Sequence, residues 1–202
     1  MIVLVFIVSA ILSLNLPFLV LNAQPPDLSR RAIAGRGVLL DYRSWAVSNG
    51  VEYDAFTNHR VTVSDLLQCA KAQNLQFRPG DILLIRFGWT EDYLQRNGME
   101  RKALGVENTL EMAKWHWENG FAAVASDTNA YEAWCPDTNS DLGCSLHEVF
   151  LAGWGMPIGE LWNLENLADE CKRLGRWSFF LTSQPLDISG GVASPSNAMA
   201  IL

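Results

Sequence analysis

Short runs of apolar residues alternate along this chain with longer segments in which apolar positions recur at helical spacing. The runs predict buried strands over residues 37–41, 82–87, 121–125, 156–161, 176–182 and 197–202. Helices are predicted over 62–74, 107–119 and 164–174, and a short helix is predicted to begin at Ser145 and end at Gly153. This alternation is typical of an α/β domain built on a mixed sheet.

Polar residues and glycines mark the ends of the predicted helices. Thr62 and Asp65 form a capping signal at the start of the helix over 62–74. Gly120 is placed to end the helix over 107–119. Asn163 is a capping residue for the helix that follows it. The helix boundaries are therefore predicted from local chemistry as well as from periodicity.

Residues 1–23 are almost uninterrupted in apolar side chains and permit several interpretations. A secretory signal lacks its usual positive residues ahead of the apolar stretch. A membrane anchor must accommodate Asn15 and Pro17. The alternatives are a first strand of the domain, ending over 13–17, or an artefact of the gene model. We divide the chain into this segment and a domain over 24–202, and expect a cytoplasmic protein, with a secreted or anchored one as the alternative.

Composition restricts the class of protein. The chain has 202 residues, which suit one domain with a substantial core. Apolar residues make up 49% and charged residues 18%, which excludes a disordered or collagen-like chain. A net charge of −7 without a Lys/Arg-rich stretch excludes a general nucleic-acid binder. The expected partner is a small-molecule substrate, with a homodimer and membrane contact left open.

The four cysteines are Cys69, Cys135, Cys144 and Cys171, and none forms a C-x-x-C pair. This spacing excludes a zinc ribbon and a thioredoxin-like redox site. Cys135 and Cys144 flank a predicted loop and would be able to form a disulfide in a secreted protein. In a reducing compartment all four are expected to be free thiols.

His147 and Glu160 are the residues whose chemistry points to a metal. Ser145 and Glu148 form a capping box, which places His147 in the first turn of its helix. The helix dipole there favours the neutral imidazole, the form that binds metals. Glu160 follows 13 residues later, near the end of an apolar strand, where it either forms a salt bridge or faces a cleft. By spacing alone the two residues are a weak motif.

Four further residues are candidates for a substrate pocket. Asp127 lies just past a buried strand, where α/β folds place their sites, and its alternative role is to cap the following loop. Trp89, Trp134 and Trp154 are three of eight tryptophans and would suit an aromatic substrate, although core packing is the default for such residues.

Other catalytic chemistries lack their motifs. The sequence has no Gly-x-Ser-x-Gly segment, so a serine hydrolase of the α/β-hydrolase type is not supported, and it has no P-loop for nucleotide phosphates. His59 lies in a predicted polar loop, and we interpret it as a surface or turn residue. His116 falls between two tryptophans in a predicted helix, and we interpret it as a packing or surface residue.

An ordered series of segments across residues 35–202 matches a known family. The segments are Gly35-Arg36-Gly37-Val38-Leu39-Leu40-Asp41, Gly80-Asp81-Ile82-Leu83-Leu84-Ile85-Arg86, Gly88-Trp89, Leu146-His147-Glu148-Val149, Gly153-Trp154-Gly155-Met156-Pro157-Ile158-Gly159-Glu160 and Pro195-Ser196-Asn197-Ala198. In this order they resemble the cyclase family that includes the metal-dependent kynurenine formamidases, particularly its fungal members. The series is specific, although no single segment is.

The resemblance implies a swivelling β/β/α cyclase-like domain and hydrolysis at a divalent metal, typically zinc. It implies His147 and Glu160 as metal ligands. A metal in such a site lowers the pKa of a bound water and polarises the substrate carbonyl. The hydroxide would attack an aryl formamide such as N-formylkynurenine and release formate and the free amine, a step of tryptophan-to-kynurenine catabolism.

The chain departs from the family pattern before Gly35. The family's main metal motif is a His-x-Gly-Thr-His-x-Asp-x-Pro segment or its fungal Gln-Trp-Asp-x-x-x-His counterpart. Here residues 30–34 lead straight into Gly35, and the first histidine is His59. Because residues 13–17 resemble the family's early strand, the comparison implies a lost internal segment and an incomplete N-terminal part. A catalytic zinc needs about three protein ligands, so an inactive member with a binding role is the alternative.

Overall fold

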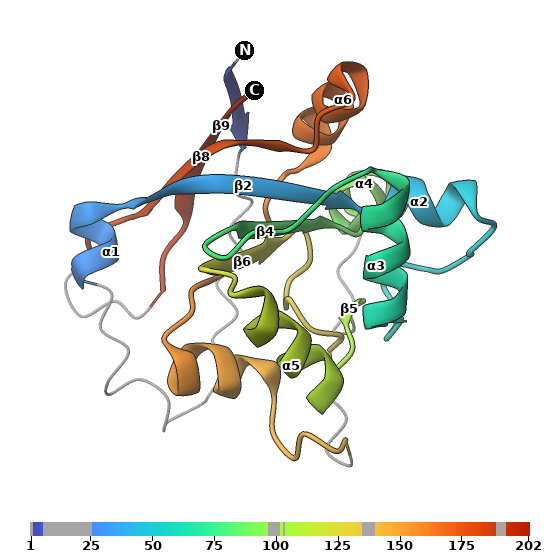
Figure 1. The fold of residues 1–202 in the computed structure, drawn as a ribbon, viewed down its shortest axis with the longest axis horizontal. Helices are drawn as coiled ribbons and strands as arrows, with labels where there is room; N and C mark the ends of the chain where they lie inside the picture. The colour runs from blue at the N-terminus through green and yellow to red at the C-terminus, as the bar shows by residue number, and fades with distance from the viewer. Residues whose placement is uncertain (1, 6–25, 97–101, 103, 135–139, 189–192) are drawn as a thin grey trace.

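A seven-stranded mixed sheet forms the centre of the molecule (Figure 1). The computed structural model describes residues 2–5, 26–96, 102, 104–134, 140–188 and 193–202. The strands, in sheet order, are β1 (Ile2–Val5), β9 (Ser196–Ile201), β8 (Ser178–Pro185), β2 (Ile33–Asp41), β4 (Ile82–Arg86), β6 (Ala123–Ser126) and β7 (Ile158–Gly159). β2, β4, β6 and β7 are parallel, and β8, β9 and β1 extend the sheet by antiparallel pairing. The predicted α/β class with a mixed sheet is confirmed.

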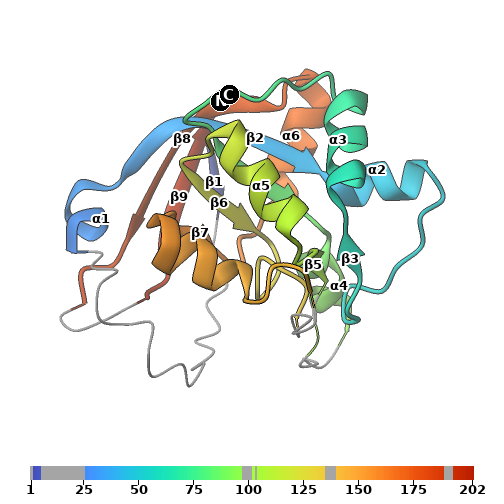
Figure 2. The same ribbon diagram turned by 60° about the horizontal axis from the view of Figure 1, so that its bottom comes forward.

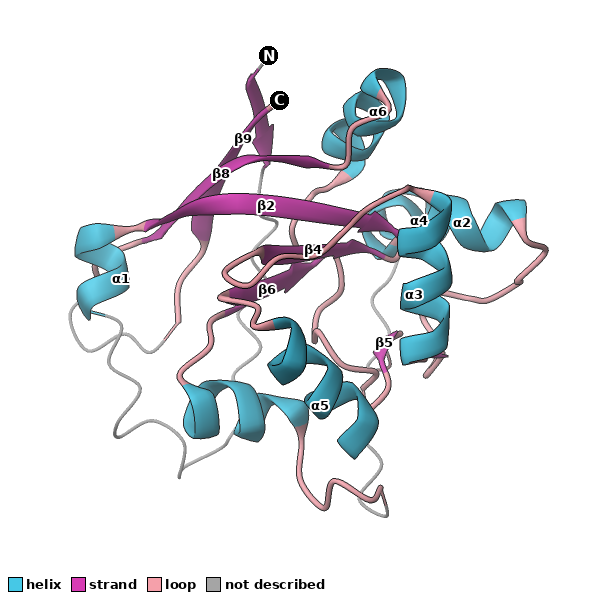
Figure 3. Cartoon of the chain, viewed as in Figure 1, coloured by secondary structure: helices cyan, strands magenta, loops and turns pink. Residues whose placement is uncertain are grey.

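Helices and a small second sheet complete the described part of the fold (Figure 3). The helices are α1 (Pro26–Arg31), α2 (Tyr42–Ser48), α3 (Val63–Ala72), α4 (Trp89–Gln95), α5 (Leu110–Asn119), the π-helix η1 (Glu148–Trp154) and α6 (Glu165–Leu174). β3 (Arg60–Val61) and β5 (Gly105–Val106) pair in parallel as a separate two-stranded sheet.

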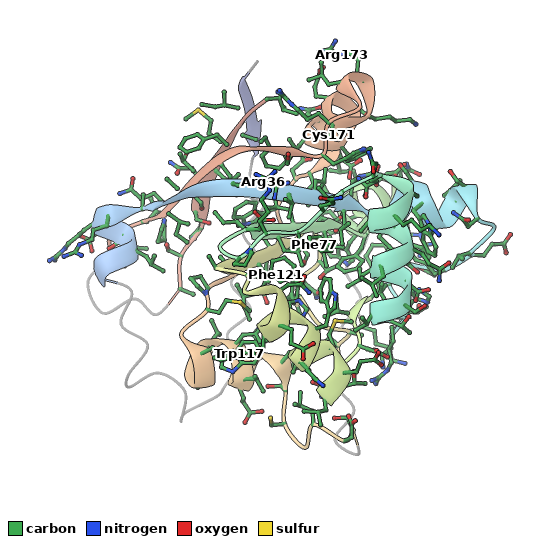
Figure 4. All side chains as sticks on the ribbon, viewed as in Figure 1. Arg36, Phe77, Trp117, Phe121, Cys171 and Arg173 are labelled. Atoms are coloured by element: carbon green, nitrogen blue, oxygen red, sulfur yellow. The ribbon has the colours of Figure 1, made fainter. Side chains whose placement is uncertain are left out.

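The central strands face two hydrophobic cores because successive side chains point to opposite faces of a sheet. Val38 and Leu40 of β2 pack in the core that contains residues of α3 and α5, whereas Leu39 packs with residues of α6. Figure 1 shows α6 on one side of the sheet and α3 and α5 on the other. In α6, the buried Cys171 lies on the sheet side and Arg173 points outward (Figure 4).

Capping contacts place the start of α3 and the end of α5 as predicted, whereas α5 begins later than predicted. The side chains of Thr62 and Asp65 each accept the other residue's backbone N–H, which completes the capping box of α3. Gly120 ends α5 in the left-handed region, at φ 64°. The predicted helix over 107–119 begins only at Leu110, because the Thr109 side chain accepts the backbone N–H of Met112 and so caps the helix at that point.

The segment after His147 differs from its prediction. The expected α-helix ending at Gly153 is the π-helix η1, which ends at Gly155 with φ 66°. The N–H of Gly155 donates to the carbonyl of Phe150, five residues back, which is the wider spacing of a π-helix. The helix therefore ends two residues later than predicted. The strand predicted over 156–161 is correspondingly short, with only two residues in β7.

β1 brings the start of the chain beside its last strand. Ile2 pairs with Ile201 and Val5 with Ala198, and the two termini lie side by side in Figure 2. Residues 2–5 therefore belong to the sheet, as the strand interpretation of the apolar segment requires for these four positions. The rest of that segment, including 13–17, lies outside the described residues. In the described ranges, no helix is long and apolar enough to cross a membrane.

The parallel strands end at one edge of the sheet, where polar side chains gather. Asp41 ends β2, Arg86 ends β4, Asp127 follows β6 and Glu160 follows β7. The buried guanidinium of Arg86 joins this edge to the start of α6, with 2.8 Å to a carboxylate oxygen of Asp41 and 2.6 Å to one of Glu165. The polar edge expected of a parallel α/β sheet is present.

Candidate functional site

A capping box places His147 at the start of η1. The backbone N–H and the hydroxyl of Ser145 both donate to Glu148 Oε2 at 2.8 Å. The N–H of Glu148 donates back to Ser145 Oγ at 3.2 Å. This is the reciprocal pattern that the sequence predicts, and it leaves His147 with helical φ and ψ of −57° and −43°.

The imidazole of His147 lies between two carboxylates. Its Nδ1 atom is 2.8 Å from Oε1 of Glu132, and its Nε2 atom is 2.9 Å from Oε1 of Glu160. The structure therefore brings together the two residues that the resemblance implies as ligands. It adds Glu132, a third residue that the sequence analysis missed.

Glu132 is fully buried, and protein donors surround its carboxylate. In addition to the ring of His147, Oε1 accepts the backbone N–H of His147 at 3.1 Å, and Oε2 accepts that of Leu146 at 2.8 Å. A glutamate flanked by Tyr131 and Ala133 in a stretch of small and aromatic residues is unusual, since a carboxylate is costly to bury without partners. A glutamate in this apolar stretch was therefore the sequence signal that could have identified Glu132 as a site residue.

Backbone contacts fix the position of Glu160. Leu161, the next residue, has a positive φ of 56°, which is uncommon for a side chain of this kind. Its N–H donates to the carbonyl of Thr128 at 2.9 Å, and the N–H of Trp162 donates to that of Ser126 at 3.0 Å. The loop after β6 therefore holds a strained turn, with a typical cost of about 1–3 kcal/mol, directly after Glu160.

The charges around His147 favour the imidazolium. Burial of the ring lowers its pKa, but the hydrogen bonds and the negative charges of Glu132 and Glu160 outweigh burial and raise the pKa to about 9. The neutral ring expected from the helix dipole is thus not the form that these neighbours favour in the metal-free protein. Both ring nitrogens donate, one to each carboxylate.

His147 and Glu160 fit a metal as two of its donors. Imidazole nitrogen and carboxylate oxygen are both ligands of zinc, and the two donor atoms already converge within 2.9 Å. The Glu160 side chain is about a third exposed, at 35%, whereas the His147 side chain is 16% exposed. In the part of the chain that the structure describes, no group of three or more His, Cys, Asp and Glu residues is arranged to hold a metal ion. The role of His147 and Glu160 as metal ligands therefore stays a prediction.

Asp127 is bonded to the backbone of the neighbouring strand end. Its two carboxylate oxygens accept the N–H groups of Phe87 and Gly88, each at 2.7 Å. Burial raises the pKa of this carboxyl to about 7, although the two amides and the charge of Arg86 oppose the shift. Asp127 thus ties the end of β6 to the turn between β4 and α4, and both its oxygens are engaged there.

The three candidate tryptophans lie in different surroundings. Trp89 is buried and stacks on Tyr93 with ring centroids 4.9 Å apart. Trp134 is half-buried. Trp154 is at the far end of η1 and contacts Trp117 at 5.1 Å, beside a surface hollow of about 300 Å³. Among the described residues, none of the three makes a ring contact with His147, so their role as a pocket remains a prediction.

The other two histidines have protein partners. His59 is half-buried, with its ring stacked on Tyr53 and its Nε2 atom 3.1 Å from the hydroxyl of Tyr42. His116 is buried, with Nδ1 2.8 Å from the carbonyl of Met112 and Nε2 2.8 Å from the hydroxyl of Tyr131. Burial lowers the pKa of His116 to about 4, so its ring is neutral.

The described cysteines, Cys69, Cys144 and Cys171, are free thiols. Cys135 lies outside the described residues, so a pairing of Cys135 with Cys144 remains a prediction.

Comparisons with known proteins identify a family match over more than half of the chain. A family model described as "Putative cyclase" matches residues 21–133. The segment with His147 and Glu160 lies beyond the matched residues. No protein with a curated description matches the chain.

Several solved structures share the fold. A crystal structure described as that of a novel cyclase is 32% identical, with a TM-score of 0.67, and the match covers 84% of this chain and 54% of that one. Isatin hydrolase A from Ralstonia solanacearum is 20% identical, with a TM-score of 0.57, and the match covers 87% of this chain and 61% of that one. A protein from Bacillus stearothermophilus described as a predicted metal-dependent hydrolase is 16% identical, with a TM-score of 0.51. The match covers 88% of this chain and 65% of that one. This chain thus spans between 54% and 65% of the length of these three proteins.

Proposed function

The chain belongs to the family described as "Putative cyclase", and from this membership we propose that it is a metal-dependent hydrolase of an aryl formamide. Water is added across the amide bond, which yields formate and the free aromatic amine. The observation that carries the proposal is the 2.9 Å approach of His147 Nε2 and Glu160 Oε1 at the carboxyl edge of the parallel strands. Two structural neighbours carry descriptions as metal-dependent hydrolases, which supports this class of reaction.

Zinc is the proposed metal, with His147 and Glu160 as two of its ligands. A divalent metal in such a centre supplies a hydroxide at neutral pH and polarises the scissile carbonyl. The residues of this chain supply the setting. Glu132 accepts a hydrogen bond from the Nδ1–H of His147, which leaves the Nε2 atom for an incoming ligand. The bonded turn after Glu160 holds its carboxylate on the same side of the ring.

A second candidate function follows from the number of donors. The chain has three histidines, and two of them are bonded to Tyr42, Met112 and Tyr131 away from His147. Among the described residues, the two donors His147 and Glu160 fall short of the roughly three protein ligands of a catalytic zinc. This count favours a family member that binds the aryl ligand without hydrolysing it.

Metal content and turnover together test the two functions. The purified chain is analysed for zinc and assayed with N-formylkynurenine and with isatin, a cyclic aryl amide chosen because structural neighbours are isatin hydrolases. The hydrolase proposal expects close to one zinc per chain and turnover that is lost in His147→Ala and Glu160→Gln. Less than about 0.1 zinc per chain, together with no turnover of either compound, overturns it. Saturable binding of the aryl compound without turnover supports the second function.

A further inference from the structure

The orientation of the His147 ring is controlled from the side opposite Glu160. We propose that Glu132 is a positioning residue that holds the imidazole with Nε2 toward Glu160, and that it is not itself a metal ligand. This inference rests on the proposed function in one respect, namely that Nε2 is oriented to bind a metal. The geometry of Glu132 and His147 stands independently of it.

Three N–H groups converge on the Glu132 carboxylate. They are the backbone N–H of Leu146 on Oε2 and the backbone N–H and ring Nδ1–H of His147 on Oε1, at 2.8, 3.1 and 2.8 Å. A carboxylate only accepts, so Nδ1 must carry a hydrogen and Nε2 is the nitrogen left to meet Glu160. The two ring nitrogens point to opposite sides of the ring. Glu132 is therefore on the wrong side to share an ion with Glu160.

The backbone that carries Glu132 is itself held in place. Glu132 forms a parallel bridge with Val106 of β5, with hydrogen bonds from Val106 N–H to the Tyr131 carbonyl and from Ala133 N–H to the Val106 carbonyl, at 3.1 and 2.9 Å. A Cβ at Gly105 would lie 2.4 Å from the carbonyl carbon of Glu132, so only glycine permits this approach. Such support is what a residue needs to fix a neighbour's orientation.

A simpler role for Glu132 would be as a cap at the start of η1. Its carboxylate accepts two backbone N–H groups at a helix start, where negative charge is favourable. A cap stabilises the protein but has no effect on the ring of His147. The two roles therefore differ in what happens to the imidazole when the carboxylate is altered.

The test compares Glu132→Gln with Glu148→Gln. Both variants remove one carboxylate from the same helix start, but Glu148 bonds only to Ser145 and is exposed. The readouts are the Nδ1–H resonance of His147 by NMR in the metal-free protein, Zn²⁺ affinity by titration, and thermal stability. Glutamine keeps one acceptor oxygen where glutamate has two, so positioning predicts that in Glu132→Gln the Nδ1–H resonance shifts or is lost and Zn²⁺ binds about 10-fold to 100-fold more weakly. Glu148→Gln is expected to keep both and to lose stability alone.

The role as a cap alone is established, and the proposal overturned, if Glu132→Gln keeps the Nδ1–H resonance and the Zn²⁺ affinity while its melting temperature falls as in Glu148→Gln. If Glu132→Gln does not fold, Glu132→Asp is read in the same way, since it keeps the charge but is one methylene too short to reach both Leu146 and the ring. Absence of Zn²⁺ binding by the unaltered chain overturns the proposed function. The Nδ1–H resonance then decides the role of Glu132 by itself.

Discussion

The Nε2 atom of His147, the residue before η1, lies 2.9 Å from Oε1 of Glu160, the residue after β7. On the other side of the ring, Glu132 is wholly buried, whereas the Glu160 side chain is 35% exposed. Because of this difference in solvent access, the two carboxylates are expected to contribute differently to the free energy of unfolding, although both contact the same imidazole.

Replacement of His147 by Ala is expected to destabilise the protein more than replacement of Glu160 by Gln. The first change leaves the buried Glu132 carboxylate without its cationic partner, with a typical cost of about 3–5 kcal/mol. The second removes a partly exposed carboxylate and is expected to cost within about 1 kcal/mol. Urea unfolding of both variants measures the difference. Equal losses would show that Glu132 does not depend on the imidazole for compensation.

His116 is expected to contribute a loss of stability as the pH falls from about 6.5 to about 4. Asp127 contributes in the opposite direction, because its pKa of about 7 makes the folded protein bind more protons in this range. The folded protein holds the pKa of His116 at about 4, below its ordinary value of 6.5, because burial disfavours the charged ring. Between these values His116 binds more protons in the unfolded chain, so its contribution favours unfolding in acid. A difference of this size corresponds to about 3 kcal/mol at its limit.

The measurement for His116 is the free energy of unfolding at several pH values from 4 to 7, for the unaltered protein and for His116→Phe. The variant is less stable throughout, because the buried hydroxyl of Tyr131 loses its acceptor, at about 1–3 kcal/mol. Without the His116 contribution, the variant is expected to lose less stability than the unaltered protein as the pH falls across this window. Identical slopes for the two proteins would show that His116 does not contribute to the pH dependence of stability.

Gly105→Ala is expected to be strongly destabilising, although glycine and alanine differ by one methyl group. The new Cβ would lie 2.4 Å from the carbonyl carbon of Glu132 and 2.6 Å from the backbone nitrogen of Ala133, so the backbone must move. Overpacking of this kind typically costs about 1–3 kcal/mol. Gly35→Ala is the control, since its nearest contact would be an ordinary 3.5 Å to Ile82. Thermal unfolding that ranks the two variants equally contradicts the prediction.

Arg86→Ala is expected to cost far more than Arg173→Ala. The Arg86 guanidinium is buried and bonds to Asp41 and Glu165, and its removal leaves the buried Asp41 carboxylate uncompensated, at about 3–5 kcal/mol. Arg173 forms a surface pair with Glu170, and its side chain is 60% exposed, so its removal is expected to change stability by less than about 1 kcal/mol. Chemical denaturation midpoints check this ranking. A similar midpoint for both variants would exclude a stabilising role for the Arg86 cluster.

Local chemistry made much of the fold predictable from the sequence. Capping by Thr62 with Asp65 and by Ser145 with Glu148 depends on residues three positions apart, so the pattern in the sequence is the pattern in space. Buried strands such as β2 and β4 are visible as apolar runs because both faces of a parallel sheet are covered. Where tertiary contacts intervene, the predictions shift: η1 takes π spacing and ends at Gly155 instead of Gly153.

For the site, the sequence by itself determined which side chains have metal-binding chemistry and that His147 begins a helix, and the ordered family segments singled out His147 and Glu160. Only the tertiary structure decided that these two meet, that Glu132 holds the other face of the ring, and that Asp127 is committed to backbone amides. The physical reason is that each of these contacts joins residues 13 to 40 positions apart. Their distances depend on strand register and on the strained turn at Leu161, which no local pattern in the sequence encodes.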